Sequence, residues 1–313
     1  MAVAPSAQPL PLPRSATGAS WPVRLVPLLT AHLVVALVAL VAIGGATRVM
    51  QAGLACPDWP LCYGVLWPGR QWNLQVFLEW FHRLDAFLVG VALLLLFALS
   101  LRFRSRFPGW LPWSAGLALA LVAVQGGLGA LTVLSQLAAP TVTLHLAAGL
   151  SLVLLLSAMH QGLERRGIDL PRWWSPLPVL AALLVGGQCL LGAAMASRWA
   201  APLCLEAGEG CHWLLLHRQG AYPAAVTVLL LAAASLALPA GHGRGRVLAF
   251  VAAALVVVQV VLGVLTLRLQ LAVPAVTIAH QLTAALLVGV LGGLWGLAFP
   301  SPSVPDRLEV AHG

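Results

Sequence analysis

The sequence is most informative at Glu79-Trp-Phe-His-Arg-Leu-Asp-Ala-Phe-Leu-Val-Gly-Val-Ala-Leu-Leu-Leu-Leu-Phe-Ala98, where a charged turn leads into a long apolar segment. The pair His82-Arg83 returns as His217-Arg218, and 217 − 82 = 135 positions separate the two copies, each near the start of such a segment. Ionisable residues at membrane depth are costly and usually functional. The duplicated pair therefore bears on both the architecture and the candidate site.

The composition identifies the class of protein. Of the 313 residues, 60% are hydrophobic and only 8% are charged, and the mean hydropathy is +0.94. Because no water-soluble fold could bury so much apolar surface, the chain is expected to be a polytopic membrane protein. All 17 basic residues are Arg, and the net charge is +8. We interpret this charge as an orientation signal, not as a nucleic-acid-binding surface.

Eight apolar runs of roughly 20 residues are long enough to span a bilayer. They begin near Leu25, Gln75, Leu111, Thr141, Pro176, Leu214, Val247 and Ala275. Arginines gather in the segments on one side of these runs, at Arg14, Arg24, Arg102, Arg104, Arg106, Arg165, Arg166, Arg172, Arg244, Arg246 and Arg307. The other side has only Arg48, Arg70, Arg198 and Arg268. The positive-inside rule then predicts a bacterial cell (inner) membrane protein with both termini cytoplasmic, the first helix being an uncleaved anchor.

An internal repeat organises the chain. His145 and His280 are also 280 − 145 = 135 positions apart, and Gln125-Gly-Gly-Leu-Gly-Ala-Leu-Thr132 resembles Gln259-Val-Val-Leu-Gly-Val-Leu-Thr266. An even number of helices per half makes the repeats parallel, related by a pseudo-two-fold axis along the membrane normal. The predicted fold is all-α, with two four-helix bundles side by side. The predicted boundaries are a cytoplasmic disordered tail at 1–20, bundles at 21–165 and 166–300, and a C-terminal tail at 301–313.

A third copy of the Gln-x-x-Leu-Gly pattern occurs at Gln188-Cys-Leu-Leu-Gly192. Glycine allows close helix approach, and a glutamine amide can bond across a helix interface. We interpret Gln125, Gln188 and Gln259 as packing elements.

Four histidines lie at one predicted depth, within about two turns of the outward ends of their helices. Within each half, one histidine from each of two helices could ligate a flat macrocycle from both sides, and bis-histidine haem is the obvious candidate. A hydrogen bond to a neighbouring helix would explain one isolated histidine equally well, but not four in matched positions. Zinc is disfavoured because no His-x3-His or carboxylate cluster completes a tetrahedral site. The four candidates are His82, His145, His217 and His280.

Arg83 and Arg218 each follow a candidate ligand and could pair with haem propionates, or extend to lipid headgroups. The other five histidines have no repeat partner or lie in predicted loops or a tail. No role is assigned to His32, His160, His212, His242 and His312.

The two halves differ three residues before the first histidine, where Glu79 corresponds to Leu214. On a helix Glu79 shares a face with His82, which suggests catalytic or proton-handling work beside a ligand held there. An ordinary ion pair with Arg83, four residues further on, is the competing explanation. Asp85, replaced by Gly220 in the second half, is a weaker candidate because it lies deeper.

Cysteines occur in pairs in two outward loops. Cys56 and Cys62 lie in Cys-Pro-Asp-Trp-Pro-Leu-Cys, and Cys204 precedes Cys211. In an oxidising compartment these pairs are expected to form disulfides. Both could be structural, and the first could instead exchange electrons as a dithiol. Cys189, within a predicted helix, is interpreted as a small packing residue.

From about residue 25 to 299 the chain resembles the haem A synthase family. The resemblance rests on Gly44-Gly-x-Thr-Arg48, the Cys56 to Cys62 loop, Glu-x-x-His-Arg at 79–83, the second His-Arg, and the later His145 and His280. It implies oxidation of the C8 methyl group of haem O to a formyl group, for assembly of aa3-type oxidases. It further implies haem b as cofactor in the C-terminal half, ligated by His217 and His280, and substrate haem at His82 and His145 with Glu79 beside it. The partners expected are haem O, membrane lipid, a haem O synthase and an electron acceptor or donor.

Two other functions would fit parts of the pattern. A di-haem b electron-transfer protein explains four histidines but not Glu79. A parallel-repeat transporter explains a polar cluster, although such transporters usually break helices near the midplane. A prenyl-transferring haem O synthase is disfavoured, because its Asp-rich motifs do not occur among only nine acidic residues.

Overall fold

The computed structural model describes residues 21–164, 170–197, 204, 206–207 and 210–300. The predicted tails, with Arg14, His312 and Arg307, and the loop arginines Arg165, Arg166 and Arg198 lie outside these ranges. The described residues form eight long α-helices and no strand, with two single-turn 3₁₀ helices, η1 (Gly69–Gln71) and η2 (Arg104–Arg106). The long helices are α1 (Trp21–Val49), α2 (Leu74–Arg102), α3 (Trp110–Leu134), α4 (Ala139–Glu164), α5 (Pro176–Met195), α7 (His212–Ser235), α8 (Gly243–Arg268) and α9 (Pro274–Gly296).

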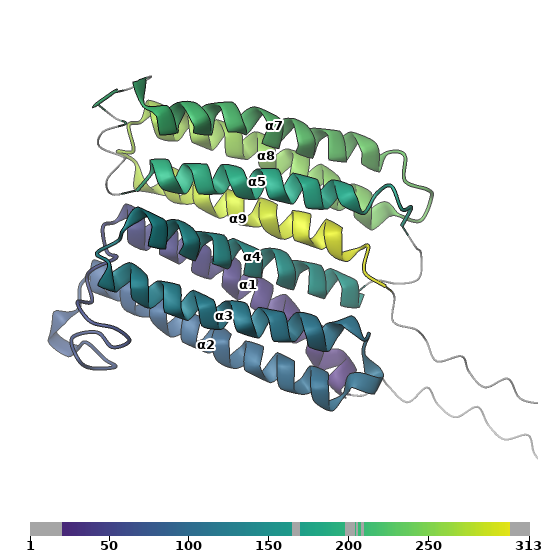
Figure 1. Cartoon of the computed structure of the whole chain (residues 1–313), viewed down its shortest axis with the longest axis horizontal. Coiled ribbons are helices and arrows are strands. Elements are labelled where there is room, and N and C mark those ends of the chain that lie inside the picture. The colour runs from purple at the N-terminus through teal and green to yellow at the C-terminus, as the bar shows by residue number, and fades with distance from the viewer. Residues whose placement is uncertain (1–20, 165–169, 198–203, 205, 208–209, 301–313) are drawn as a thin grey trace, which may run out of the picture.

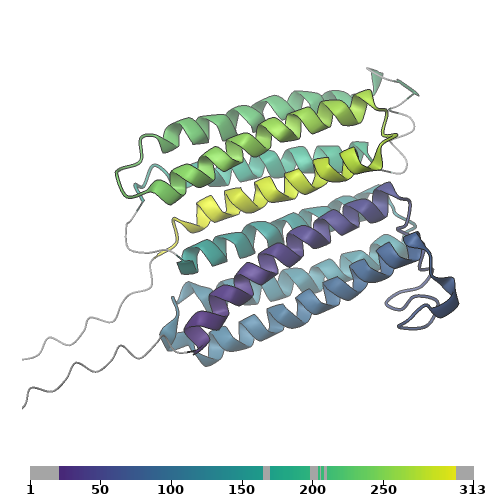
Figure 2. The same ribbon diagram turned by 180° about the vertical axis from the view of Figure 1, so that it is seen from behind.

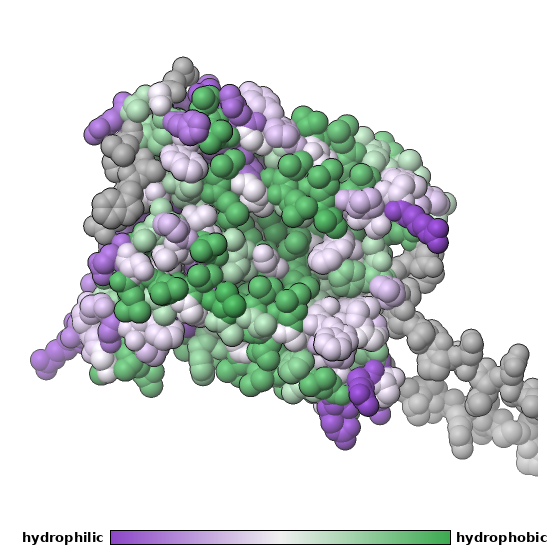
Figure 3. Space-filling model, viewed as in Figure 1, coloured by the Kyte–Doolittle hydropathy of each residue, from purple (hydrophilic) through white to green (hydrophobic). Residues whose placement is uncertain are grey.

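Seven of these helices are long and apolar enough to cross a membrane, which makes the protein a multi-pass membrane protein. Large apolar side chains lie on their outer faces, and Figure 3 shows them between two more hydrophilic ends. The helix outside this group is α7, whose first two turns carry His212, His217 and Arg218. It runs beside the other helices and packs on α5 and α8 (Figure 1).

The helices begin and end where local chemistry favours it. Asn73 caps α2, because its side-chain oxygen accepts a hydrogen bond of 2.9 Å from the main-chain nitrogen of Val76. Proline stands in the first turn of α5 and of α9, where its missing N–H costs nothing. The turns that follow α3 and α8 have the same conformation. Gln136 and Leu137 after α3 have φ of 52° and 61°, and Gln270 and Leu271 after α8 have φ of 50° and 62°.

Each half of the chain packs its own four helices in a ring. In the first half α1 contacts α2, α2 contacts α3, α3 contacts α4, and α4 returns to α1. The helices α5, α7, α8 and α9 repeat this order of contacts. Figures 1 and 2 show the two sets side by side, with α4 and α9 along the seam.

The seam between α4 and α9 is built for close approach. A Cβ atom placed on Gly292 would meet the main chain of Leu154, and one on Gly296 would meet that of Ala158. Such small residues let two helices touch main chain to main chain. Both helices also contribute fully buried leucines to the hydrophobic core, among them Leu156 and Leu291.

The start of α1 and the end of α9 lie at one end of the molecule (Figure 1). The C-terminal ends of α1, α3, α5 and α8 lie at the opposite end, as do the starts of α2, α4, α7 and α9. Since His82, His145, His217 and His280 all occur in the first three turns of these four helices, they share one level.

Candidate functional site

Each of the four histidines packs against a glycine on the helix before it in the chain. His82 on α2 faces Gly44 on α1, and His217 on α7 faces Gly192 on α5. A Cβ atom added to these glycines would lie 2.9 Å and 2.8 Å from the imidazole Cε1. The same pairing joins His145 to Gly129 and His280 to Gly263, at 3.4 Å and 3.1 Å. Glycine therefore makes room for an imidazole at four equivalent places.

A main-chain carbonyl four residues before each glycine also interacts with the ring. These carbonyls belong to Leu40 for His82, Gln125 for His145, Gln188 for His217 and Gln259 for His280. Metal-ligating histidines are commonly oriented by a carbonyl or carboxylate on the ring nitrogen that does not bind the metal. The Nδ1 atoms of His82, His145 and His280 are nonetheless buried and without a hydrogen-bond partner of normal geometry.

The glutamines, which the sequence suggested as packing elements, reach the histidines with their side chains. Gln125 Nε2 lies 3.2 Å from His145 Nε2, and Gln259 Nε2 lies 3.4 Å from His280 Nε2. Gln188 Nε2 lies 3.0 Å from Nδ1 of His217 and donates to its main-chain oxygen at 2.6 Å. The sequence signal for this contact was the spacing Gln-x3-Gly.

The first pair of histidines has the separation that a shared iron requires. The ring centroids of His82 and His145 are 6.4 Å apart. A metal bound about 2 Å from one nitrogen of each ring would put the centroids roughly 6 Å apart. In the second half His217 and His280 are also close enough for their charges to interact. With this separation in the first pair and a glycine opposite each of the four rings, the residues fit a haem in each half.

Glu79 is 4% exposed and bonds to two groups. Its Oε2 accepts a hydrogen bond of 2.7 Å from the main-chain nitrogen of Cys56, and its Oε1 pairs with Arg83 at 2.5 Å. The ion pair considered from the sequence is therefore present. The contact with the loop, however, could not be seen from the helix alone. His82 follows on the same helix, one turn further into the molecule.

Arg83 connects this carboxylate to the loop that follows α1. Its guanidinium donates to the main-chain oxygens of Asp58 at 2.6 Å, Cys56 at 3.3 Å and Leu61. The loop is closed by the expected disulfide between Cys56 and Cys62, both almost fully buried. The guanidinium thus holds the loop over the N-terminal end of α2.

Trp80 makes three further contacts between α2 and the loop. Trp80 of α2 donates its indole N–H to the oxygen of Leu66 at 2.6 Å, and its ring meets Trp67 and Trp72 edge to face.

Desolvation raises the pKa of Asp58, but hydrogen bonds from the main-chain N–H groups of Gly64 and Tyr63 outweigh it. With the charge of Arg83 they hold the pKa of this carboxyl below its usual range. The loop is therefore a folded cap.

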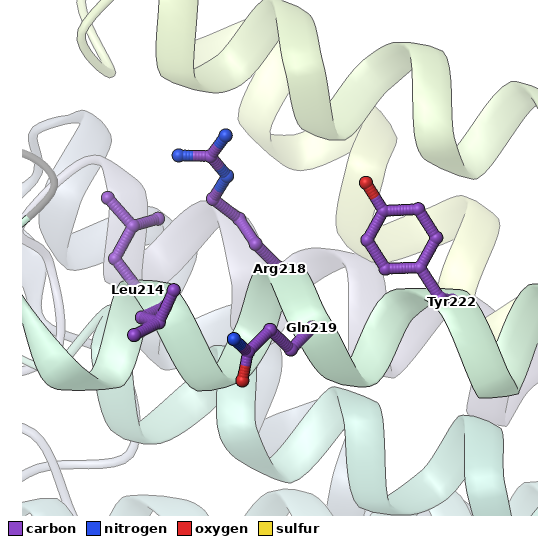
Figure 4. A pocket seen from close by; sticks show the side chains of 5 residues that line it. Leu214, Arg218, Gln219 and Tyr222 are labelled. Atoms are coloured by element: carbon purple, nitrogen blue, oxygen red, sulfur yellow. The ribbon is translucent and has the colours of Figure 1, made fainter.

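In the second half, the helix position that corresponds to Glu79 carries an apolar residue and lines an open pocket. Leu214 takes the place of Glu79 and lines a pocket of about 290 Å³ with Leu215, Arg218, Gln219 and Tyr222. Figure 4 shows Arg218 and Tyr222 projecting from one side of α7. The second expected disulfide, between Cys204 and Cys211, lies at the start of this helix, where Cys211 Sγ accepts from the main-chain nitrogen of Leu214 at 3.5 Å.

Arg48, given no site role from the sequence, bridges the two halves. From the end of α1 it donates to the main-chain oxygen of Ala196, at the end of α5, at 3.2 Å. Its charge also interacts with His280. One turn earlier, Gly45 packs directly on Gln281 of α9. A contact between residues 148 positions apart is not readable from local sequence.

The other residues considered in the sequence analysis lie away from the four histidines and Glu79. Asp85 interacts electrostatically with His32 of α1, one turn further into the molecule than His82. His160 bonds to Thr30 at 3.2 Å, and His242 to the main-chain oxygen of Pro239 at 3.1 Å. Cys189 is a free, half-buried thiol packed against the core of α5 and its neighbours. Among the residues that the structure describes, no three His, Cys, Asp or Glu side chains gather in one metal-binding cluster.

Known proteins match this chain over most of its length. The model of the COX15-CtaA family, described as cytochrome oxidase assembly protein, matches residues 28–291. The heme A synthase of Allorhizobium ampelinum is 30% identical over 376 aligned positions, covering 96% of this chain and 99% of that protein. That of Shewanella oneidensis is 32% identical over 181 positions, and the chain spans 54% of its length.

A shorter match is to a protoheme IX farnesyltransferase of Halobacterium salinarum, 35% identical over 133 positions, which covers 42% of this chain and 29% of that protein. The chain belongs to the COX15-CtaA family of cytochrome oxidase assembly proteins and is an oxidoreductase of haem A biosynthesis.

Proposed function

We propose that this protein is a haem A synthase that oxidises the C8 methyl group of haem O to a formyl group. The observation that carries the proposal is the buried carboxylate of Glu79, one helical turn from His82, where the second half has Leu214. Each hydroxylation removes two electrons from the methyl carbon and replaces one C–H bond with C–OH. Loss of water from the resulting diol leaves the formyl group. With water as the oxygen source, each hydroxylation releases two electrons and two protons, and a separate electron acceptor takes up the electrons. With dioxygen as the source, an electron donor supplies two electrons and the second oxygen atom leaves as water.

The two halves divide the work in this proposal. His82 and His145 hold the haem that is oxidised, and His217 and His280 hold a resident haem b. When bound, haem b supplies one-electron redox chemistry that no side chain offers. Support comes from a difference between the two histidine-bearing helices in the part of the chain that the structure describes: the position three residues before His82 carries Glu79, which bonds to the loop after α1, whereas the position before His217 carries Leu214.

Glu79 acts on protons in this scheme. A carboxylate screened from water can take up a proton released from the substrate or stabilise a cationic intermediate. The Cys56 N–H and the Arg83 guanidinium fix its two oxygens, which keeps the group in place during the reaction. Arg218, which lines the pocket on α7, is the candidate for pairing with a haem propionate. Arg83 could pair with a propionate only while it also keeps its hydrogen bonds to the loop.

We further propose that the halves are parallel repeats, with bundles at 21–165 and 166–300 related by a pseudo-two-fold axis along the membrane normal. Matching histidine–glycine pairs, matching contact order and the matching turns after α3 and α8 support this arrangement. The arginine distribution supports a bacterial inner membrane orientation, with the tails 1–20 and 301–313 cytoplasmic. A haem O synthase is a proposed partner, since one partial relative is a protoheme IX farnesyltransferase.

Co-expression with a haem O synthase in a host that lacks haem A tests the proposal. Extraction and chromatography of the haems should reveal haem A only when the protein is present. A culture that accumulates haem O and haem B alone, although the purified protein contains haem b, would instead identify a di-haem electron-transfer protein.

A further inference from the structure

The loop after α1 exposes apolar side chains at residues 65–67, here called the loop tip. Leu66 is 81% exposed and Trp67 is 63% exposed, and Val65 beside them is also exposed. The loop nevertheless has a core of its own, because Cys56 and Cys62 are buried where it packs on α2. An exposed apolar surface on a folded segment usually marks a contact with a membrane or with another protein.

A series of aromatic rings connects the loop tip to the outer face of α2. The ring centroids of Trp67 and Trp72 are 4.8 Å apart, and those of Trp72 and Phe77 are 6.3 Å apart. Phe77 in turn stacks on Phe81, one turn further along the helix, at 5.6 Å. Both phenylalanines are exposed, on a helix that packs mainly against α1 and α3. The rings therefore lead from the loop tip onto a surface that faces lipid.

The length of α2 places the loop tip near the surface of the bilayer. Its 29 residues span about 43 Å, and a bilayer with its headgroup regions is about 40–45 Å thick. Because α2 ends at Arg102 on one side of the membrane, its first residue, Leu74, lies at the headgroup level of the other side. Figure 1 shows the loop at that end, beside the start of α2.

Tryptophan is the residue enriched at the headgroup level of membrane proteins. All exposed tryptophans in the described part of the chain lie near helix ends or in loops, at Trp21, Trp59, Trp67, Trp113, Trp173 and Trp213. Trp213 stands at the start of α7, at the same end of the molecule as the loop tip. The loop tip thus lies at the level where the other exposed tryptophans indicate a membrane surface.

We propose that Val65, Leu66 and Trp67 insert into the headgroup region of the bilayer beside α2 and anchor the loop there. Lipid is favoured over a protein partner because the loop tip carries no charge and continues the lipid-facing surface of α2. The inner side of the same segment bonds to the helix, since Trp80 donates to the oxygen of Leu66 and packs on Trp67. Lipid on one side and Trp80 on the other therefore hold the loop closed together. This inference does not depend on the proposed function.

Photocrosslinking tests the anchor in the full-length protein, reconstituted into vesicles of palmitoyl-oleoyl phosphatidylethanolamine and phosphatidylglycerol. Benzoylphenylalanine in place of Leu66 should form adducts with the acyl chains, seen by mass spectrometry as the added mass of one phospholipid. The same probe in place of Phe87, exposed midway along α2, is the positive control. In place of Arg70, an exposed charged residue of the same loop, it should give several-fold fewer adducts. Lipid adducts at Phe87 but not at Leu66, or a cross-link from Leu66 to a second copy or, in native membranes, to another protein, overturns the proposal.

A pair of variants at Leu66 tests the anchor without a bulky probe. The side chain is mostly exposed, so neither variant should disturb the fold of the loop. In the same vesicles Leu66→Asp should make the disulfide between Cys56 and Cys62 several-fold faster to reduce with dithiothreitol, because a carboxylate opposes insertion into lipid. Leu66→Met stays apolar and should match the unmodified protein. Equal reduction rates in the two variants, with the disulfide between Cys204 and Cys211 as internal reference, would also overturn the anchor.

Discussion

The main-chain nitrogen of Cys56 donates a hydrogen bond to Glu79 Oε2 at 2.7 Å, which joins the loop after α1 to a carboxylate on α2. Arg83 binds the other oxygen of Glu79 and three carbonyls of the same loop. Disulfide, carboxylate and guanidinium therefore form one unit. Its loop-to-helix hydrogen bonds join residues 22 to 27 positions apart in the chain.

The substitution Glu79→Gln removes the negative charge of the side chain and nearly keeps its shape. The amide oxygen can still accept from Cys56, but the carboxylate that would handle protons is gone. Haem A formation should fall about 100-fold or more, the range of general acid–base catalysis. Haem b content should stay unchanged, because His217 and His280 lie in the other half. Haem chromatography of membranes and a pyridine haemochrome spectrum measure both quantities, and equal loss of haem b would contradict the division of labour.

Much of this fold was predictable because a bilayer constrains sequence strongly. All eight long helices begin within four residues of the predicted starts, from Trp21 against Leu25 to Pro176 itself. The common level of the four histidines was predicted from their spacing, and the structure places them at one level. The loop contacts of Arg83 and the bridge from Arg48 to Ala196 were not foreseen, because neither partner has a sequence pattern that points to the other. The glutamines were recognised as interfacial, but the identity of their partners depended on helix rotation.

Substitution of the glycines tests the histidine pockets directly. In Gly192→Ala the new methyl group would lie 2.8 Å from His217 Cε1, so the ring must turn away. Since alanine favours a helix over glycine by up to about 1 kcal/mol, the fold should survive while haem b is lost. Gly44→Ala should likewise lose the first-half haem by displacing His82.

Gly186→Ala on the same helix as Gly192 is the matched control, because a Cβ atom there would meet nothing within 4 Å. It should keep its haem b spectrum. Full haem content in both Gly44→Ala and Gly192→Ala would show that the four imidazoles do not hold haem in the orientation described.

Asp58 makes the loop sensitive to acid. Its pKa is lowered in the folded loop, so the stability it contributes is present in full above the ordinary value of 3.8 and is lost as the pH falls through the lowered value. Peptic cleavage between Cys56 and Cys62 should therefore rise over roughly pH 4 to 2 in the unmodified protein. In Asp58→Asn cleavage should already be high at pH 4 and change little below it. A parallel pH dependence in both proteins would exclude Asp58 as the cause.

Arg83→Lys tests whether the guanidinium holds the loop closed over the carboxylate. A lysine keeps the charge but is a single point donor on a flexible stem, so it cannot bridge Glu79 and three separated carbonyls. The disulfide between Cys56 and Cys62 should become several-fold faster to reduce with dithiothreitol, measured by alkylation and mass spectrometry. The disulfide between Cys204 and Cys211 provides an internal reference, and Arg70→Lys, at an exposed position of the same loop, should behave as the unmodified protein. Equal reduction rates in Arg83→Lys and Arg70→Lys would mean that the aromatic contacts of Trp80, and not Arg83, keep the cap in place.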